Sequence, residues 1–228
     1  MTTLTQRLAL LQERIETACA SNARALSDVQ LIGVSKFQPG QSVVEAHELG
    51  LTDFGENYLQ EAAEKIELLA SKPLIWHFIG SIQSNKTKVI AESFHWVHTV
   101  DRLKIAQRLS SQCPPDKVLN ILLQVNIDSD SNKGGVTAEE SVDLVKQISN
   151  LPNLKLRGLM AILSQDTDPR VGYETVAQLH RDLKALIHPE FAPGWDTLSM
   201  GMTGDLEQAI AAGATMIRVG TALFGPRE

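Results

Sequence analysis

The 228 residues of this chain are enough for one large hydrophobic core, and the length is close to that of a complete β/α barrel. The content of 43% apolar and 21% charged residues is typical of a globular protein in water. A net charge of -6 argues against nucleic acid or an anionic membrane as the main partner, and the spacing of Cys19 and Cys113 matches no metal or redox motif.

The N-terminal segment is expected to be an amphipathic helix that opens with a capping box of Thr3 and Gln6. Its apolar residues recur at helical spacing, at Leu4, Leu8, Leu11 and Ile15. The segment lacks the basic and apolar regions of a signal peptide, and no apolar run in the chain has membrane-spanning length. With two cysteines in no disulfide pattern, these features predict a cytoplasmic protein.

Eight short runs of β-branched or apolar residues follow and are predicted to be strands. They lie at residues 29–36, 53–57, 74–80, 94–100, 118–126, 154–163, 197–201 and 216–224. Helical patterns lie between them at 57–70, 137–149 and 170–187, the second with a Thr137/Glu140 capping box. Gly50 and Gly213 stand where left-handed helix ends are expected.

Strands that alternate with helices predict βαβ units and a parallel sheet, which could be an open doubly wound sheet or a closed barrel. Eight repeats in this length favour closure. We therefore expect the α/β class, as a single (β/α)8 TIM-type barrel with an extra N-terminal helix. No linker-like composition divides the chain, so residues 1–228 are expected to form one domain.

In such a barrel, functional side chains lie at the carboxyl ends of the strands. Lys36 ends an apolar run, where partial desolvation disfavours the ammonium form and would make its amine a nucleophile. A lysine at a strand end could equally extend to solvent. Asn57, at the end of the second strand, could contact a flat ligand ring or could be the N-cap of the following helix.

Two neighbouring strand ends predict a phosphate-binding pocket, because loops after strands seven and eight often bind phosphate in this fold. They supply hydroxyls, a helix start, and glycines that let the backbone approach an anion closely. The residues concerned are Ser199, Gly201, Thr203, Gly204, Gly220 and Thr221. The glycines alone could instead be ordinary turn residues.

Arg218 lies two residues before Gly220 and therefore on the same face of the last strand. A buried guanidinium needs an acceptor, which could be a phosphate or a ligand ring nitrogen. The alternative is a salt bridge to a barrel carboxylate such as Glu56 or Asp53.

Three motifs are interpreted as structural. The segment 80–87 is like a phosphate-binding loop but has Asn85 in place of the second glycine. His95 and His98 have an odd spacing on a strand, which points them to opposite faces and favours packing or surface roles over a metal site. The acidic segment 128–130 lacks the features of a calcium loop and is interpreted as a solvated loop.

Six segments from residue 34 to residue 225 are specific enough to suggest a family. They read Val34-Ser-Lys36, Phe54-Gly-Glu-Asn57, Trp76-His-Phe-Ile-Gly-Ser-Ile-Gln-Ser-Asn-Lys86, Arg157-Gly-Leu-Met160, Ser199-Met-Gly-Met202 and Arg218-Val-Gly-Thr-Ala-Leu-Phe-Gly225. Together they resemble the pyridoxal phosphate homeostasis protein family, whose fold is similar to the barrel domain of alanine racemase. Thr203, where the family often has Ser, and Ile162-Leu163, where a proline would be more familiar, depart from the pattern.

The resemblance implies that the chain binds pyridoxal 5′-phosphate (PLP) as a Schiff base on Lys36, with Asn57 facing the ring. It also implies that Ser199, Gly201, Gly220 and Thr221 hold the phosphate and that Arg218 approaches the ring nitrogen or the phosphate edge. The implied role is PLP homeostasis: binding PLP and passing it to PLP-dependent apoenzymes without a catalytic turnover of its own. We further expect a monomer.

Two enzymatic alternatives stay open. The first is a PLP-dependent amino-acid racemase, which would need a second domain to supply an opposing base, and the chain ends three residues after Gly225. The second is a Schiff-base aldolase without PLP. Lys133, in the loop after the fifth strand, could receive PLP during transfer or could be an ordinary solvated lysine.

Overall fold

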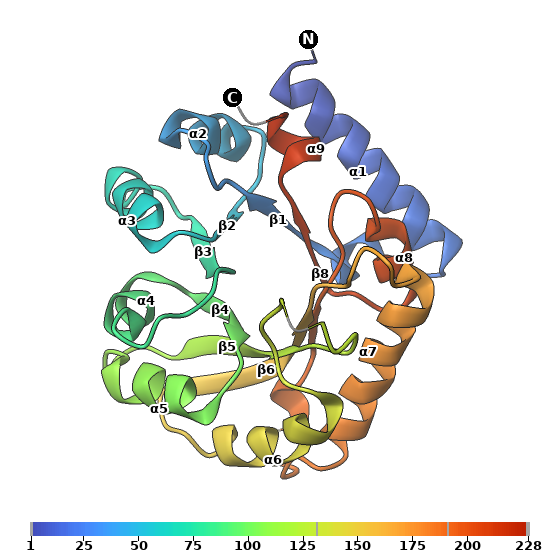
Figure 1. Ribbon diagram of the computed structural model, residues 1–228. Helices are drawn as coiled ribbons and strands as arrows, with labels where there is room; N and C mark the ends of the chain where they lie inside the picture. Colours follow the sequence, from blue (N-terminus) through green and yellow to red (C-terminus); the bar gives the residue numbers. More distant parts are fainter. Residues whose placement is uncertain (1, 131, 191, 227–228) are drawn as a thin grey trace.

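The computed structural model describes residues 2–130, 132–190 and 192–226. Eight parallel strands close into a barrel in the order β1 to β8, and β1 pairs with β8. The strands are β1 (Gln30–Val34), β2 (Asp53–Glu56), β3 (Ile75–Phe78), β4 (Trp96–Val100), β5 (Leu119–Val125), β6 (Leu154–Ala161), β7 (Thr197–Ser199) and β8 (Met216–Val219). Figure 1 shows them around one central axis, which confirms the predicted TIM-type barrel.

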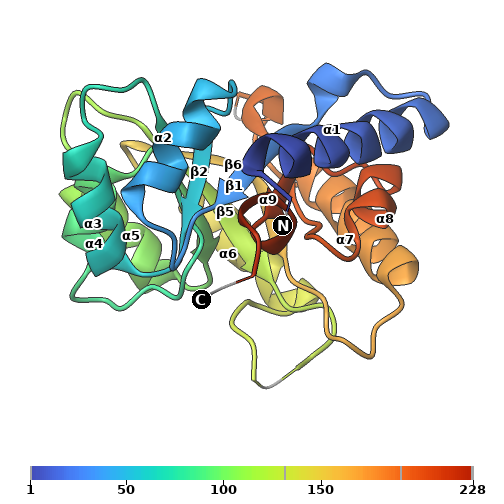
Figure 2. The same ribbon diagram turned by 90° about the horizontal axis from the view of Figure 1, so that it is seen from above.

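Helices cover the outside of the barrel between successive strands (Figures 1 and 2). They are α1 (Leu4–Ser21), α2 (Gly40–Glu48), α3 (Leu59–Leu68), α4 (Thr87–Ser93), α5 (Leu103–Gln112), α6 (Ala138–Ile148), α7 (Pro169–Lys184), α8 (Leu206–Ala211) and α9 (Thr221–Phe224). Within the described ranges, no helix is long and apolar enough to cross a membrane.

The predicted helix starts are largely confirmed. Thr3 caps α1 and Thr137 caps α6, each in a reciprocal capping box with the third residue of its helix. Gly50 and Gly213 follow α2 and α8 with φ of 97° and 101°, as expected for left-handed helix ends. The prediction of a strand over 216–224 was wrong at its end, because the backbone turns after Val219 into the short helix α9.

The extra N-terminal helix packs against the end of the chain. In Figure 1, α1 runs alongside α8 and α9. Arg14 pairs with Glu207 of α8 at 2.7 Å, and Arg7 donates to the carbonyl oxygens of Leu223 and Phe224 at the end of α9. These contacts give the last carbonyls of α9 the donors that a helix end needs, and so fix the loop after β8.

Side chains of the barrel strands divide between two packing regions. Outward-facing residues such as Phe54, Val97 and Leu159 join the main core beneath the helices. A small inner cluster fills part of the barrel and consists of Ile32, Trp96, Leu122, Met160 and Met216. The inward-facing Arg218 near the carboxyl end of β8 reaches the site described next.

Candidate functional site

A cavity of about 340 Å³ opens at the carboxyl ends of the strands. Its size is within the range of small-molecule sites. Five of the seven residues that the family resemblance assigned to the site line it: Lys36, Asn57, Arg218, Gly220 and Thr221. Thr203 and Gly204, which the strand-end pattern also predicted for the phosphate pocket, line it too. The apolar walls come from residues that were not predicted as site residues: Val34, Ile79, Met160, Ile162 and Met202.

Lys36 lies two residues after the end of β1, and the residues on both sides of it are held by side chains of β2 and α3. The Ser35 hydroxyl donates to Glu56 Oε1 at 2.6 Å, and the Ser35 carbonyl accepts from Lys65 Nζ at 2.6 Å. On the other side, the Phe37 amide donates to Glu61 Oε1 at 2.6 Å. The base of the Lys36 side chain therefore has a defined position at the cavity wall.

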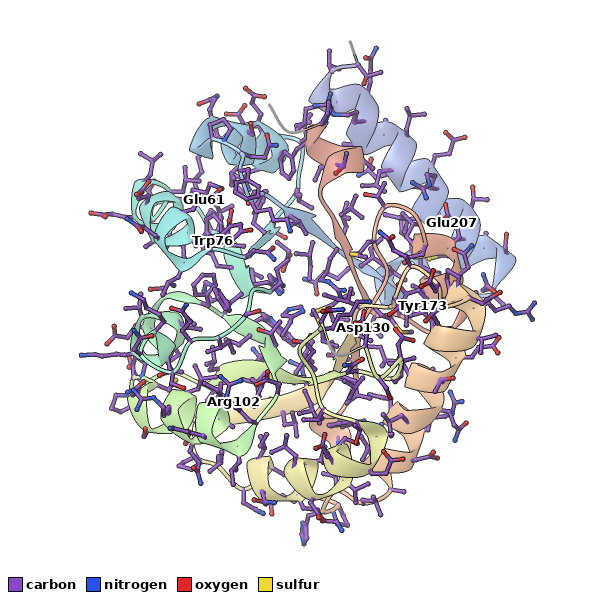
Figure 3. All side chains as sticks on the ribbon, viewed as in Figure 1. Glu61, Trp76, Arg102, Asp130, Tyr173 and Glu207 are labelled. Atoms are coloured by element: carbon purple, nitrogen blue, oxygen red, sulfur yellow. The ribbon has the colours of Figure 1, made fainter. Side chains whose placement is uncertain are left out.

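These contacts converge on a buried ammonium group. Lys65 lies 2.8 Å from Glu56 Oε1 and 2.6 Å from Glu61 Oε1, and its side chain is 6% exposed. Burial raises the pKa of the Glu56 carboxyl, although hydrogen bonds from Lys65 and Ser35 oppose this. Figure 3 shows the labelled Glu61 on α3. Sequence reasoning missed this cluster because it found no spacing that joins the three residues.

Asn57 has an unsatisfied group at the site. Its Oδ1 atom is buried and has no hydrogen-bond partner within the described residues. The N-cap of α3 is Tyr58, which makes no side-chain capping bond, so the alternative interpretation of Asn57 as the N-cap was wrong. A buried amide oxygen without a partner is costly unless a ligand or water supplies a donor.

Arg218 is 4% exposed and lines the cavity. Its Nη1 donates to Ser199 Oγ at 2.8 Å and its Nη2 donates to the Ala161 carbonyl at 2.9 Å. The alternative salt bridge to Glu56 or Asp53 was wrong: Glu56 pairs with Lys65, and Asp53 pairs with His77. Burial lowers the pKa of the guanidinium, but arginine stays protonated in proteins and so brings a positive charge to the cavity.

Ser199 and Gly201 do not line the cavity, although the sequence predicted both as phosphate ligands. The Ser199 hydroxyl is fully buried behind Arg218 and also contacts His98 Nδ1 at 2.8 Å. Gly201 has φ of 94°, and a Cβ there would lie 2.5 Å from the Cβ of Ala209. The glycine therefore permits the close approach of α8 to the barrel.

The polar end of the cavity is formed by the loops after β7 and β8. Thr203 and Gly204 come from the first loop, Gly220 from the second, and Thr221 is the first residue of α9. Asp205 shapes the first loop, because its Oδ1 accepts from the Met202 amide at 2.6 Å and its Oδ2 accepts from the Tyr173 hydroxyl at 2.9 Å. Backbone amides and hydroxyls beside a buried guanidinium are groups that bind an anion.

The structural interpretations of the histidines agree with the structure. His95 is exposed and accepts a hydrogen bond from the Trp76 amide, while His98 lies on the opposite face, buried in the barrel. Among the described residues, no group of three side chains could hold a metal ion.

The acidic loop after β5 projects from one end of the barrel (Figure 2), and its carboxylates contact neighbouring residues. Asp128 accepts from the Ser164 amide and the Thr167 hydroxyl. Asp130, labelled in Figure 3, lies 3.8 Å from Lys133, whose Nζ also contacts Ser164 Oγ at 3.2 Å. Lys133 is outside the group of residues that line the cavity.

The chain is similar in sequence and fold to the barrel domain of alanine racemases. The sequence model described as alanine racemase, N-terminal domain, matches residues 11–228. An alanine racemase from Corynebacterium glutamicum has the same fold, with a TM-score of 0.65 at 14% identity over 96% of this chain and 61% of that one. This likeness concerns the barrel only.

The particular family follows from nearer relatives. The pyridoxal phosphate homeostasis protein of Pseudomonas aeruginosa is 50% identical over 100% of this chain and 97% of that protein, and that of Pasteurella multocida is 47% identical over 99% and 98%. PipY of Synechococcus elongatus, solved with PLP bound, superposes with a TM-score of 0.80 at 33% identity over 93% of this chain and all of that one. The chain belongs to the pyridoxal phosphate homeostasis protein family.

Proposed function

We propose that the chain binds PLP in this cavity as a Schiff base on Lys36 and takes part in PLP homeostasis as a carrier. The observation that carries the proposal is the convergence of a lysine amine, a buried amide oxygen without a partner and a buried guanidinium on one cavity. PLP supplies an aldehyde for an amine and a phosphate for an anion site. Relatives named for PLP homeostasis support this assignment.

The residues present fit the cofactor. Asn57 offers a polar contact that the protein itself leaves unsatisfied, and Arg218 offers a positive charge with two donors already fixed in direction. Thr203, Gly204, Gly220 and Thr221 would hold the phosphate. In this revised site Ser199 supports Arg218, and Gly201 shapes the loop, instead of touching the phosphate.

A carrier is favoured over a racemase by the composition of the cavity wall. Among the described residues that line it, Lys36 and Arg218 are the titratable ones, and no histidine, tyrosine or carboxylate stands opposite the lysine. Racemisation needs a second group that can take and return a proton. Arginine has donors only, so Arg218 cannot accept a hydrogen bond from a protonated ring nitrogen of PLP. A protonated ring is the form that stabilises a carbanion, so this arginine disfavours carbanion chemistry.

The remaining parts of the proposal concern the cellular setting. We infer that PLP-dependent apoenzymes receive the cofactor from this chain in the cytoplasm, that the protein acts as a monomer, and that residues 1–228 form one PLP-binding domain. Nucleic acid and membranes are not expected as partners, since the chain carries a net charge of -6.

The test is the absorption spectrum of the purified protein with PLP. Wild type and the control Lys133→Ala are expected to show a Schiff-base band, and Lys36→Ala is expected to lose it while retaining weaker, phosphate-directed binding. A band that survives in Lys36→Ala would overturn the assignment. Sustained racemisation of L- or D-amino acids by wild type would overturn the carrier role and favour the racemase.

A further inference from the structure

A continuous line of polar side chains runs through the barrel interior behind Arg218. It starts at Asp53, the first residue of β2, and passes through His77 of β3, His98 of β4 and Ser199 of β7 to Arg218 of β8. None of the five residues is more than 4% exposed. The interior of such a barrel is usually filled by branched apolar side chains, so a buried polar line needs an explanation.

The contacts along the line are all within hydrogen-bond distance. His77 Nε2 lies 2.9 Å from Asp53 Oδ1, and His77 Nδ1 lies 2.9 Å from His98 Nε2. His98 Nδ1 lies 2.8 Å from Ser199 Oγ, and Ser199 Oγ lies 2.8 Å from Arg218 Nη1. Each imidazole therefore uses both of its nitrogens within the line.

The donor and acceptor of each bond follow from the chemistry of the two ends. An ionised Asp53 can only accept, so His77 carries its proton on Nε2. Burial lowers the pKa of both histidines, and a neutral His77 must then accept at Nδ1 from His98 Nε2. The same reasoning makes Ser199 donate to His98 Nδ1 and accept from Arg218, which has donors only.

Every bond thus points in one direction, from the cation at the cavity to the carboxylate at the amino end of β2. Burial alone would raise the pKa of Asp53, but hydrogen bonds from His77 and Thr52 lower it, which keeps the carboxylate charged. In a medium of low polarity, aligned hydrogen bonds strengthen one another.

We propose that Asp53, His77, His98 and Ser199 form a directed relay of hydrogen bonds that positions the Arg218 guanidinium at the cavity. These four are positioning residues, since none of them lines the cavity. The relay fixes one guanidinium nitrogen, and the Ala161 carbonyl fixes the other. The part of the proposal that concerns PLP rests on the proposed function.

The first test uses the protein without cofactor. A long-range proton–nitrogen spectrum of uniformly ¹⁵N-labelled protein reports which imidazole nitrogens carry protons, and His77→Gln and His98→Gln assign the signals. We expect both rings to be neutral and protonated at Nε2. A cationic ring, or a proton on Nδ1 of either histidine, would overturn the relay.

The second test removes the charge at the far end. Asp53→Asn is expected to give His98 a mixture of tautomers, although Asp53 contacts His98 only through His77. It is also expected to raise the PLP dissociation constant about tenfold, a loss typical of one charged hydrogen bond. The matched control is Asp196→Asn, whose carboxylate binds Arg157 outside the relay at 2.9 and 2.7 Å. The control is expected to change neither readout.

A third variant guards against misfolding of Asp53→Asn. Ser199→Ala removes one hydroxyl, and a similar loss of PLP affinity is expected while His77 keeps its tautomer. Unchanged PLP affinity in both variants would contradict a positioning role for the relay. A wild-type protein that binds no PLP would instead overturn the proposed function, and the tautomers of the cofactor-free protein would still decide whether the relay exists.

Discussion

The backbone carbonyl oxygen of Asn57 packs directly against Gly80: a Cβ on this glycine would lie only 1.9 Å from that oxygen. Asn57 follows β2 and Gly80 follows β3, so the contact sets the spacing of two neighbouring strand ends at the cavity. The atom that would clash is backbone, which cannot move aside as a flexible side chain can. Gly80 is therefore required for the position of Asn57.

Gly80→Ala is expected to lower the free energy of unfolding by about 3 kcal/mol, the upper range for overpacking of a well-packed position. PLP retention is expected to fall with it, because Asn57 is displaced. The control for stability is Gly204→Ala, because beyond its chain neighbours no atom lies within 4 Å of the added Cβ. Its free energy of unfolding should change by under about 0.5 kcal/mol. Urea denaturation of both variants checks this, and equal stabilities would contradict it.

The buried Lys65 is expected to be essential for stability. Lys65→Met leaves the Glu56 carboxylate without its partner and should cost about 3 to 5 kcal/mol near neutral pH, as measured for other broken buried ion pairs. The exposed pair Lys88 and Glu92, 3.8 Å apart, provides a control, and Lys88→Met should cost under about 1 kcal/mol.

The cost of Lys65→Met should also depend on pH. The pKa of Glu56 is already raised in the folded protein, so the folded state binds its proton more readily than the unfolded chain does. Stability from this group is present below its ordinary pKa and is lost as pH rises through the folded value. The defect of the variant should therefore shrink on acidification, and a defect that grows would contradict the assignment.

His180 gives a pH dependence of the opposite sign. Its ring stacks on Trp195 with centroids 5.1 Å apart, and burial lowers its pKa to about 4. Between about pH 6.5 and 4 the unfolded chain binds a proton that the folded protein does not, so the free energy of unfolding falls as pH falls through this window. Denaturation curves across this pH window should show a smaller loss of unfolding free energy for His180→Phe, which keeps a stacked ring, than for wild type. An identical loss in the two proteins would refute the prediction.

Thr221 distinguishes a phosphate contact from a ring contact. Thr221→Val keeps the shape of the side chain and removes the hydroxyl, so the dissociation constant for PLP should rise about tenfold, as for one lost bond to a charged group. Affinity for pyridoxal, which lacks the phosphate, should stay the same. Thr175→Val, on the outside of α7, is the control. Equal losses for the two ligands would place Thr221 away from the phosphate.

The fold could be predicted because its signal is repeated along the chain. Each strand is a short apolar run, and the capping boxes at Thr3 and Thr137 marked two helix starts. Helices α2, α4, α5 and α8 were not identified individually, since they are short and lack comparable capping signals. The predicted end of the last strand was wrong because the apolar residues after Gly220 fit a strand and a buried helix equally well.

The site could be predicted only where residues stand at strand ends. Lys36, Asn57, Arg218 and Thr221 follow from the rule that function lies at the carboxyl ends of barrel strands. Ser199 satisfied the same rule, but the side chain of Arg218 lies between it and the cavity. The relay from Asp53 was invisible, because its hydrogen bonds join strands whose relative register no local pattern specifies.

The most direct test of the central claim is to reduce the PLP-loaded protein with borohydride and map the labelled peptide by mass spectrometry. Borohydride converts a Schiff base into a stable secondary amine, so the vitamer stays on the lysine that held it. We predict that the label lies on Lys36 in wild type and is absent from that position in Lys36→Ala. A label on another lysine of the wild-type protein, or none at all, would contradict the account.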